Sequence, residues 1–426
     1  MRFCFFSKIK ILPLLLIISF STFAQNPHKK VLFIGNSYTY VNDLPQLLHD
    51  LAASAGDTIE FDSSTPGGYT FQLHCSNATT LSKIKAQPWD FVILQAQSQE
   101  PSFDPAQVQT DTYPYARQLC DSIKANNTCS EVVFYMTWGR KNGDASNCAA
   151  YPPVCTYLGM QSRLRQSYLE MADSNKATCA PVGMAWKNVR DQYPNINLYQ
   201  GDESHPLLEG SYLAACVFYA TLFQKTPLGA TYTAGLDTAT AHALQSTAAV
   251  TVLDSMNLWR IKANYPKPLF TINLTSPFNF QFANNSMQST AYTWNFGDGS
   301  SSTLANPTHT YANAGTYTVT LTASNACSTD SLKQIINTAS FGIKNNDLEE
   351  EALAYPNPGT GIFYLKPGLH AIKALEIINS SGQLILKQNT IASPLIDLRN
   401  FPEGLYYLKV LTTDGKSRSY KIVRGE

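Results

Sequence analysis

The sequence of 426 residues lacks an excess of either charge, because its 31 lysine and arginine residues are balanced by 31 aspartate and glutamate residues. Charged residues make up only 15% of the chain. These shortages exclude the basic surface with which proteins bind nucleic acid or anionic lipids. The hydrophobic share of 44% is high enough to form cores, which argues against a disordered chain, and the length predicts two or three domains.

Long hydrophobic runs are also lacking, apart from one at the N-terminus. Ile11–Ala24 is almost wholly apolar and follows a positive start, but it has about 14 residues, against roughly 20 for a membrane-spanning helix. Small residues at Thr22 and Ala24 fit a signal-peptidase site. We therefore predict a signal peptide at residues 1–24 and no transmembrane segment after its removal. An uncleaved anchor is the alternative.

The cysteine and histidine spacing typical of a zinc site is lacking as well, so we predict no metal. The chain has nine cysteines, and cysteines of an exported protein can pair. The close pairs that we expect are Cys120 with Cys129 and Cys148 with Cys155. Cys216 lies in an apolar run and is expected to be a buried free thiol.

Apolar strands alternate with amphipathic helices over residues 25–264. The expected strands are short apolar runs, at Val31–Ile34, Thr58–Phe61, Phe91–Leu94 and Val132–Met136. A helix is indicated by apolar residues with 3.6-residue spacing, at Met160, Leu164, Tyr168 and Met171. This alternation predicts an α/β domain with a parallel sheet that is covered by helices on both faces.

Residues 269–339 have a different pattern. In Thr316–Ser324 apolar residues alternate with polar ones, which is typical of a half-buried strand and predicts a β-sandwich. Trp294–Gly299, with Tyr317 downstream, resembles the PKD domain. The resemblance implies a small immunoglobulin-like sandwich that serves as a spacer or binding module. We expect Trp294 and Tyr317 in its core and Asp298 in a turn.

The last segment, residues 350–426, is again rich in expected strands. Its landmarks in order are Tyr355–Pro358, Gly361, Phe363, Gly404–Val410 and Lys421–Val423. As a set they resemble the type A C-terminal sorting domain of the type IX secretion system. The resemblance implies a second small β-sandwich that engages the secretion machinery. It also implies export across the outer membrane, to the extracellular space or the cell surface.

A serine follows the first expected strand. Val31–Ile34 leads into Gly35, Asn36 and Ser37, and helix-forming sequence comes next. Open α/β folds bind their ligands at the carboxyl edge of the sheet, which is where this serine is expected. A serine is a nucleophile only if a base removes its proton. The pattern is not a GxSxG elbow, because position 39 is a threonine.

The candidate base lies far downstream, in Gly201–Pro206. An aspartate and a histidine three residues apart on a loop can bring both side chains to one side of a turn. The carboxylate can then fix the imidazole tautomer while the other ring nitrogen faces the serine. We therefore predict Ser37, Asp202 and His205 as the catalytic residues.

Ser37 near the start and Asp202-x-x-His205 near the end together resemble the SGNH (GDSL-like) hydrolase superfamily over residues 25–264. The resemblance implies a flavodoxin-like parallel sheet and hydrolysis of esters through an acyl-serine. It also implies that the reaction needs no metal and no cofactor.

The same resemblance implies an oxyanion hole, whose donors stabilise negative charge on the tetrahedral intermediate. We expect it to be formed by Ser37, by Gly68 in a Gly-Gly-Tyr-Thr sequence and by an amide side chain after the third strand. The family has an asparagine there, in Gly-x-Asn-Asp, whereas this sequence has Gln95-Ala96-Gln97. Aligning the strand ends favours Gln97, and Gln95 remains the rival donor.

Two further candidates lie near these blocks. Trp138 follows the fourth strand and is expected to line the substrate cleft, with an ordinary surface loop as the alternative. His74 is next to Cys75, so a Cys–His nucleophilic pair is conceivable. Adjacent residues rarely point at each other, which disfavours such a pair.

Together these features predict a secreted serine esterase that acts on a small-molecule or polysaccharide ester. Removal of acetyl groups from a carbohydrate is the specific hypothesis. One alternative is a surface glycan-binding or adhesion protein with an inactive hydrolase fold. Another is an acyltransferase that uses the same triad.

Overall fold

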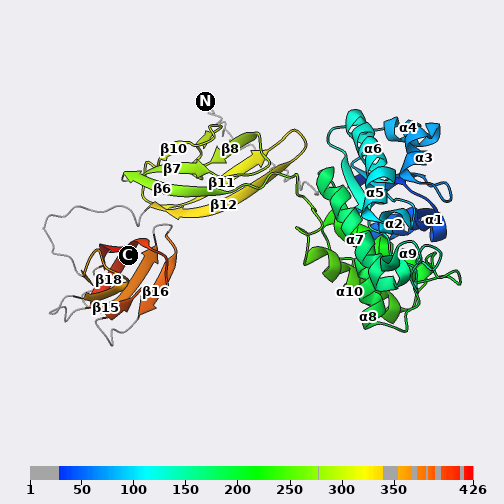
Figure 1. Ribbon diagram of the computed structural model, residues 1–426. Helices are drawn as coiled ribbons and strands as arrows, with labels where there is room; N and C mark the ends of the chain where they lie inside the picture. The colour runs from blue at the N-terminus through cyan, green and yellow to red at the C-terminus, as the bar shows by residue number, and fades with distance from the viewer. Residues whose placement is uncertain are drawn as a thin grey trace, which may run out of the picture. The chain divides into compact units, whose positions relative to one another are not determined.

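The computed structural model describes residues 28–276, 278–338, 354–365, 372–379, 382–388, 395–412 and 417–425. The predicted signal peptide, residues 1–24, lies outside these ranges. The chain divides into two compact units between Ala263 and Asn264. In Figure 1 the helices lie in the blue-to-green part of the chain, and the yellow and orange parts consist of strands.

The first unit is built on a five-stranded parallel sheet with the order β2-β1-β3-β4-β5. Its strands are β1 (His28–Ile34), β2 (Thr58–Ser64), β3 (Phe91–Leu94), β4 (Glu131–Tyr135) and β5 (Thr178–Ala180). This is the strand order of flavodoxin-like folds. The predicted fold class is therefore confirmed, as are the four predicted strands.

Helices connect the strands of this sheet. They are α1 (Ser37–Tyr40), α2 (Leu44–Ser54), α3 (Phe71–Ser76), α4 (Ala78–Lys85), α5 (Pro105–Asp111), α6 (Tyr113–Asn126), α7 (Tyr157–Ser174), α8 (Val182–Gln192), α9 (Leu208–Phe223) and α10 (Thr238–Leu253), with 3₁₀ turns at Val41–Asp43, Glu100–Ser102 and Pro152–Cys155. All side chains of Val31–Ile34 and Phe91–Leu94 are buried, without alternation, because helices cover both faces of the sheet. The predicted helical face of Met160, Leu164, Tyr168 and Met171 is the buried face of α7.

The strand order reverses at β1, which lies between β2 and β3. In open α/β sheets such a reversal leaves a crevice outside the carboxyl ends of the two strands that flank it. Ser37 follows β1 directly, and Gln97 follows β3. The topology thus brings these two predicted residues to the same edge of the sheet.

A sandwich of two antiparallel sheets follows, with the orders β10-β7-β6 and β12-β11-β8-β9. Its strands are β6 (Phe270–Ser276), β7 (Asn279–Asn284), β8 (Ala291–Asn295), β9 (Ser301–Ser302), β10 (Thr308–Thr310), β11 (Thr316–Ser324) and β12 (Thr329–Asn337). Trp294 is fully buried in the core and Tyr317 packs against it, as predicted. Asp298 forms the expected turn by accepting the backbone N–H of Ser300 at 3.0 Å.

The C-terminal part also has two antiparallel sheets, with the orders β13-β14-β17 and β16-β15-β18-β19. Its strands are β13 (Ala354–Tyr355), β14 (Ile362–Leu365), β15 (Ile372–Asn379), β16 (Leu384–Gln388), β17 (Leu395–Asp397), β18 (Gly404–Thr412) and β19 (Ser417–Arg424). Side chains of both sheets, such as Phe363 and Leu408, meet in one apolar core. The predicted second β-sandwich is therefore confirmed.

One predicted disulfide is present and the other is wrong. Cys148 and Cys155 are bonded to each other. Cys129 is also disulfide-bonded, but Cys120 is a free, buried thiol. The two side chains lie in different places: Cys120 is on the buried face of α6, whereas Cys129 is in an exposed turn. Cys216 is buried and free, as predicted.

Candidate active site

The turn after β1 presents Ser37 as the first residue of α1. Asn36 caps this helix, and its side-chain oxygen accepts the backbone N–H of Tyr38 at 3.2 Å. The first N–H groups of a helix have no acceptor within the helix. Within the described part of the chain the backbone N–H of Ser37 makes no hydrogen bond. A donor is therefore free directly beside the serine hydroxyl.

Asn36 also joins the three loops that follow β1, β2 and β3. Its Nδ2 donates to the carbonyl oxygen of Tyr69, in the loop after β2, at 2.9 Å. Its Oδ1 accepts from Nε2 of Gln95, after β3, at 2.9 Å, and its backbone N–H donates to Oε1 of Gln95 at 2.8 Å. The position of Ser37 is thus fixed by hydrogen bonds to residues far away in the sequence.

Gln95 is fully buried, and its amide group is fully used. One N–H goes to Asn36 and the other to the carbonyl oxygen of Ala96, while Oε1 also accepts from the Thr39 hydroxyl at 2.9 Å. An amide has only two donor hydrogens. Gln95 therefore has no donor left for an oxyanion, which argues against its role as the rival donor.

Gln97 differs from Gln95 in having spare donors. Its Oε1 accepts the backbone N–H groups of Gln99 at 2.7 Å and Glu100 at 3.2 Å, which fixes the orientation of the amide. Among the described residues its Nε2 makes only two contacts, both long, at 3.4 Å to Ser98 Oγ and 3.5 Å to Gln99 Oε1. Such contacts are weak, so the amide hydrogens are available to an incoming group.

Gly68 lies in the loop after β2, in the left-handed conformation with φ +72°. Glycine adopts this conformation without the steric cost that a side chain would add. Gly68 is exposed, and its N–H has no hydrogen bond to any described residue. It is a second free backbone donor in a loop that Asn36 ties to the serine turn.

The loop that carries Asp202 and His205 is closed by a bridge between Tyr199 and Pro206. Asp202 Oδ1 accepts the backbone N–H groups of Ser204 at 3.1 Å and His205 at 3.0 Å. Glu203 between them has φ +60°, which is unusual for a residue with a side chain. The resulting tight turn brings the carboxylate and the imidazole into contact.

The three predicted catalytic side chains are brought together. Nδ1 of His205 contacts Oδ2 of Asp202, and Nε2 of His205 lies 2.9 Å from Oγ of Ser37. Partial burial acts to raise the pKa of Asp202, but the hydrogen bonds from His205 and from the backbone of Ser204 outweigh it and lower that pKa. An ionised Asp202 keeps the proton on Nδ1, so Nε2 can accept the proton of the Ser37 hydroxyl.

Two contacts fasten the histidine loop to the serine turn. The hydroxyls of Tyr38 and Ser204 lie 2.6 Å apart, and both side chains are buried. Asn42 Nδ2 donates to the carbonyl oxygen of Pro206 at 3.1 Å. These contacts hold the residues on both sides of His205 against the segment that follows Ser37.

Trp138 does not line a substrate cleft, so that prediction is wrong. Its side chain is fully buried and stacks between Tyr38, at 4.7 Å, and Trp186, at 3.8 Å. Its ring N–H donates to the carbonyl oxygen of Ser204 at 3.0 Å. A buried indole needs a partner for its N–H, and Trp138 finds it in the loop that carries His205. Trp138 therefore helps to hold that loop in place.

His74 and Cys75 do not form a nucleophilic pair. His74 is fully buried, its Nε2 donates to the carbonyl oxygen of Gly35 at 2.9 Å, and its Nδ1 contacts the Thr80 hydroxyl at 2.9 Å. Burial lowers the pKa of His74 and raises that of the Cys75 thiol to about 11. His74 instead holds the turn that leads to Ser37.

Sequence reasoning missed three residues that shape this site: Asn36, Tyr38 and Ser204. Asn36 had a usable signal, because an asparagine before a helix is a typical N-cap. Ser204 stands inside the Asp-x-x-His motif, but nothing in the sequence pairs it with Tyr38. No set of three or more His, Cys, Asp or Glu side chains in the described residues could bind a metal ion.

Two segments of the chain match known families. Residues 265–339 match the PKD domain, and residues 353–424 match the secretion system C-terminal sorting domain. Both resemblances are thereby confirmed. The sorting domain indicates that the protein is exported to the cell surface or the extracellular space. None of the described helices combines the length and hydropathy needed to cross a membrane.

A stretch of 66 residues is 42% identical to Collagenase ColA of Bacillus cereus, but the match covers 16% of this chain and only 7% of the collagenase. Among solved structures, a DUF4886 family protein from Bacteroides uniformis is 20% identical with a TM-score of 0.46, and the similarity covers 53% of this chain and 95% of that one. A candidate SGNH hydrolase from Slackia heliotrinireducens is 25% identical with a TM-score of 0.38, and the similarity covers 46% of this chain and 99% of that one.

Proposed function

We propose that this exported protein is a serine esterase of the SGNH type that removes acetyl groups from a carbohydrate. One observation carries the proposal. Ser37 Oγ lies 2.9 Å from His205 Nε2, and the opposite nitrogen of the same ring contacts Asp202. With a partner on each ring nitrogen, a histidine can take the proton from a serine and later return it.

In the first half of the proposed reaction, His205 accepts the hydroxyl proton of Ser37 while Oγ attacks the ester carbonyl carbon. The carbonyl oxygen becomes an oxyanion, which the backbone N–H groups of Ser37 and Gly68 and the amide of Gln97 stabilise. The intermediate then collapses. The bond to the sugar oxygen breaks, the leaving alcohol takes the proton from His205, and the acetyl group stays on Ser37.

In the second half, a water molecule replaces the sugar. His205 removes a proton from the water, whose oxygen attacks the acetyl carbonyl carbon, and the same donors bear the new oxyanion. Collapse breaks the bond to Ser37 Oγ, which takes the proton back from His205. Acetic acid leaves and gives its proton to the solvent, and every group of the enzyme returns to its starting state without a metal or a cofactor.

An exposed aromatic ring next to the nucleophile supports a carbohydrate as the substrate. Tyr40 is 49% exposed, although aromatic side chains are mostly buried. It stands three residues after Ser37 on α1, and its ring lies next to Gly67 in the loop of the proposed donor Gly68. A flat ring with a polar tip offers the apolar face of a sugar a surface on which to pack.

Hydrolysis of p-nitrophenyl acetate by the full chain tests the reaction. Ser37→Ala is expected to lower turnover by about 10⁶-fold, since loss of a triad serine can have that effect. Ser300→Ala is the matched control, because Ser300 also contacts a histidine but lies in the PKD domain. If folded wild-type protein shows no turnover that depends on Ser37, the glycan-binding alternative becomes the better reading.

A substrate panel tests the carbohydrate part separately. Acetylated xylan and acetylated sugars are expected to be better substrates than long-chain lipid esters. The opposite preference would remove the carbohydrate from the proposal and leave the esterase. An added acceptor alcohol, followed by product analysis, distinguishes hydrolysis from acyl transfer.

A further inference from the structure

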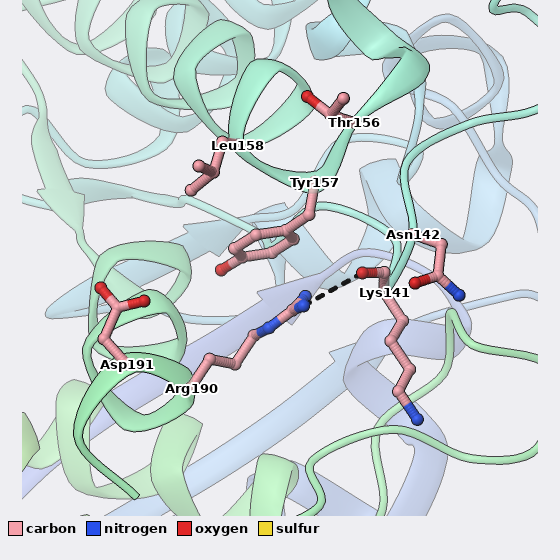
Figure 2. Close-up of a pocket in the computed structure, with 7 residues that line it drawn as sticks. All are labelled: Lys141, Asn142, Thr156, Tyr157, Leu158, Arg190 and Asp191. Carbon is pink, nitrogen blue, oxygen red and sulfur yellow. Dashed lines mark hydrogen bonds between the residues drawn. The ribbon is translucent and has the colours of Figure 1, made fainter. Parts of the chain in front are cut away.

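A depression of about 440 Å³ lies on the first unit, and Figure 2 shows the residues that line it. It is lined by residues of the segment after β4, the start of α7 and the end of α8, which include Lys141, Asn142, Tyr157, Leu158 and Arg190. The proposed reaction uses none of these side chains.

Arg190 is the central cation of this depression. Its guanidinium stacks on the Tyr157 ring at 3.7 Å, as Figure 2 shows. It donates to the Tyr199 hydroxyl at 3.0 Å and to the carbonyl oxygen of Lys141 at 3.1 Å. Both acceptors are neutral, and a guanidinium has five N–H donors. The group is therefore held rigidly in place while most of its hydrogen-bonding capacity remains unused.

A second cation, Lys141, is exposed at the same depression. In the described part of the chain, no carboxylate forms an ion pair with Lys141 or Arg190. The carboxylate of Asp191, which also lines the depression, pairs with Lys187 one turn earlier on α8. Two cations without an acidic partner on a concave surface favour an anionic ligand, since arginine and lysine bind carboxylates and other oxyanions through charge-assisted hydrogen bonds.

The depression is joined directly to the catalytic loop. The backbone N–H of Lys141 donates to the carbonyl oxygen of Glu203 at 2.9 Å, and Asn142 Nδ2 donates to Glu203 Oε2 at 2.8 Å. Glu203 precedes His205 by two residues, so their Cα atoms lie within about 7 Å of each other. A ligand bound here would thus lie close to the loop on which the proposed reaction depends.

We propose that this depression binds an anionic sugar unit, through a carboxylate or a sulfate group, next to the acylated sugar on which Ser37 acts. Arg190 and Lys141 would bind the anionic group, and Leu158, 60% exposed, would contact the apolar face of the sugar ring. The proposal rests on the proposed function for the chemistry at Ser37, but not for the binding itself. The natural substrate would then be an acidic, acylated polysaccharide.

Calorimetric titration of the full chain with Ser37→Ala tests the binding without turnover. The probes are an oligogalacturonate, a sulfated carrageenan oligosaccharide and a neutral xylo-oligosaccharide. We expect a charged probe to bind more tightly than the neutral one, with an affinity that falls as salt is added. The better of the two charged probes identifies the carboxylate or the sulfate as the recognised group.

Substitutions in the same background locate the site. Lys141→Gln is expected to weaken binding of the charged probe about tenfold, the scale of one charge-assisted hydrogen bond. Lys141→Arg, which keeps the charge, is expected to retain most of the affinity. Lys85→Gln on α4 removes another exposed lysine of the same unit and is expected to change nothing.

The outcomes separate this inference from the proposed function. Equal affinity for neutral and charged probes, or no loss with Lys141→Gln, overturns the anionic site even if Ser37-dependent ester hydrolysis is found. Charge-selective binding that depends on Lys141, in a protein without any Ser37-dependent turnover, supports the site and overturns the esterase.

Discussion

The first unit and the PKD domain each contain a histidine in contact with an aspartate and a serine, but the contacts go to different ring nitrogens. In the first, Asp202 contacts Nδ1 of His205 and Ser37 contacts Nε2. In the second, Asp298 and Ser300 both contact Nε2 of His309, at 2.8 Å and 3.3 Å. Because both partners share one nitrogen, His309 cannot pass a proton from a serine while an aspartate holds its other side.

The surroundings of the two clusters differ as well. Free backbone donors of Ser37 and Gly68 and the spare amide of Gln97 belong to loops that meet at the first cluster. His309 is instead stacked on Phe296 at 4.2 Å and lies against Tyr311 at 4.6 Å. The same three residue types therefore form a candidate catalytic site in one domain and a set of stabilising contacts in the other. Ring geometry, and not composition, makes the difference.

The largest expected contrast comes from removing each carboxylate charge. Asp202→Asn should lower turnover of p-nitrophenyl acetate by about 10⁴-fold, because the amide leaves His205 in the wrong tautomer. Asp298→Asn should leave turnover unchanged. Steady-state kinetics on both variants of the full chain checks this. An equal loss in both, or none with Asp202→Asn, would break the comparison.

A smaller contrast is expected between the two glutamines after β3. Gln97→Ala should lower kcat by about 10²–10³ with little change in KM, since its amide acts on the oxyanion. Gln95→Ala should instead lower the free energy of unfolding, by roughly 1–3 kcal/mol, because it leaves buried partners at Asn36 unpaired. Kinetics and denaturant unfolding measured side by side separate the two roles. A normal kcat in Gln97→Ala would indicate that water, and not Gln97, is the third hydrogen-bond donor to the oxyanion.

The smallest expected effect is a pH dependence confined to the PKD domain. Burial acts to raise the pKa of Asp298, but hydrogen bonds from Ser300 and His309 lower it to about 2. A carboxyl group whose pKa falls on folding stabilises the fold above its unfolded pKa of about 3.9, and that stability is lost as the pH falls toward 2.

Hydrogen exchange of peptides from β8 to β11 in the full chain should therefore accelerate between about pH 4 and pH 2, after correction for the intrinsic exchange rate. Asp298→Asn should flatten that dependence, whereas Asp202→Asn should not affect it. A wild-type profile that does not change over this range would show that the Asp298 contacts contribute nothing to stability.

Much of this molecule could be predicted from local patterns. Four sheet strands are short apolar runs, the helical face of α7 and the β11 alternation repeat at a fixed spacing, and the loop with Asp202 and His205 is a short motif. The fifth strand, Thr178–Ala180, was missed because its three residues are too few to stand out as an apolar run.

The remainder depends on pairings across the sequence. The bond between Asn36 and Gln95 spans 59 positions, and nothing local distinguishes Gln95 from Gln97. Trp138 looked like a cleft residue because of its place after a strand. Only the stack with Tyr38 and Trp186 shows that it is buried. Residues that act through remote partners are therefore the ones that sequence reasoning assigned wrongly or overlooked.

The links among the three loops at Asn36 have a consequence for the conditions under which the protein operates. They join amides and backbone groups, so none of them carries a net charge that dissolved ions could screen. An exported protein works at the salt concentration of its surroundings, which the cell does not regulate. The hydrogen bonds that position Ser37 should therefore be the same in fresh water and in brine. The proposed affinity of Lys141 for a charged sugar would instead fall as salinity rises.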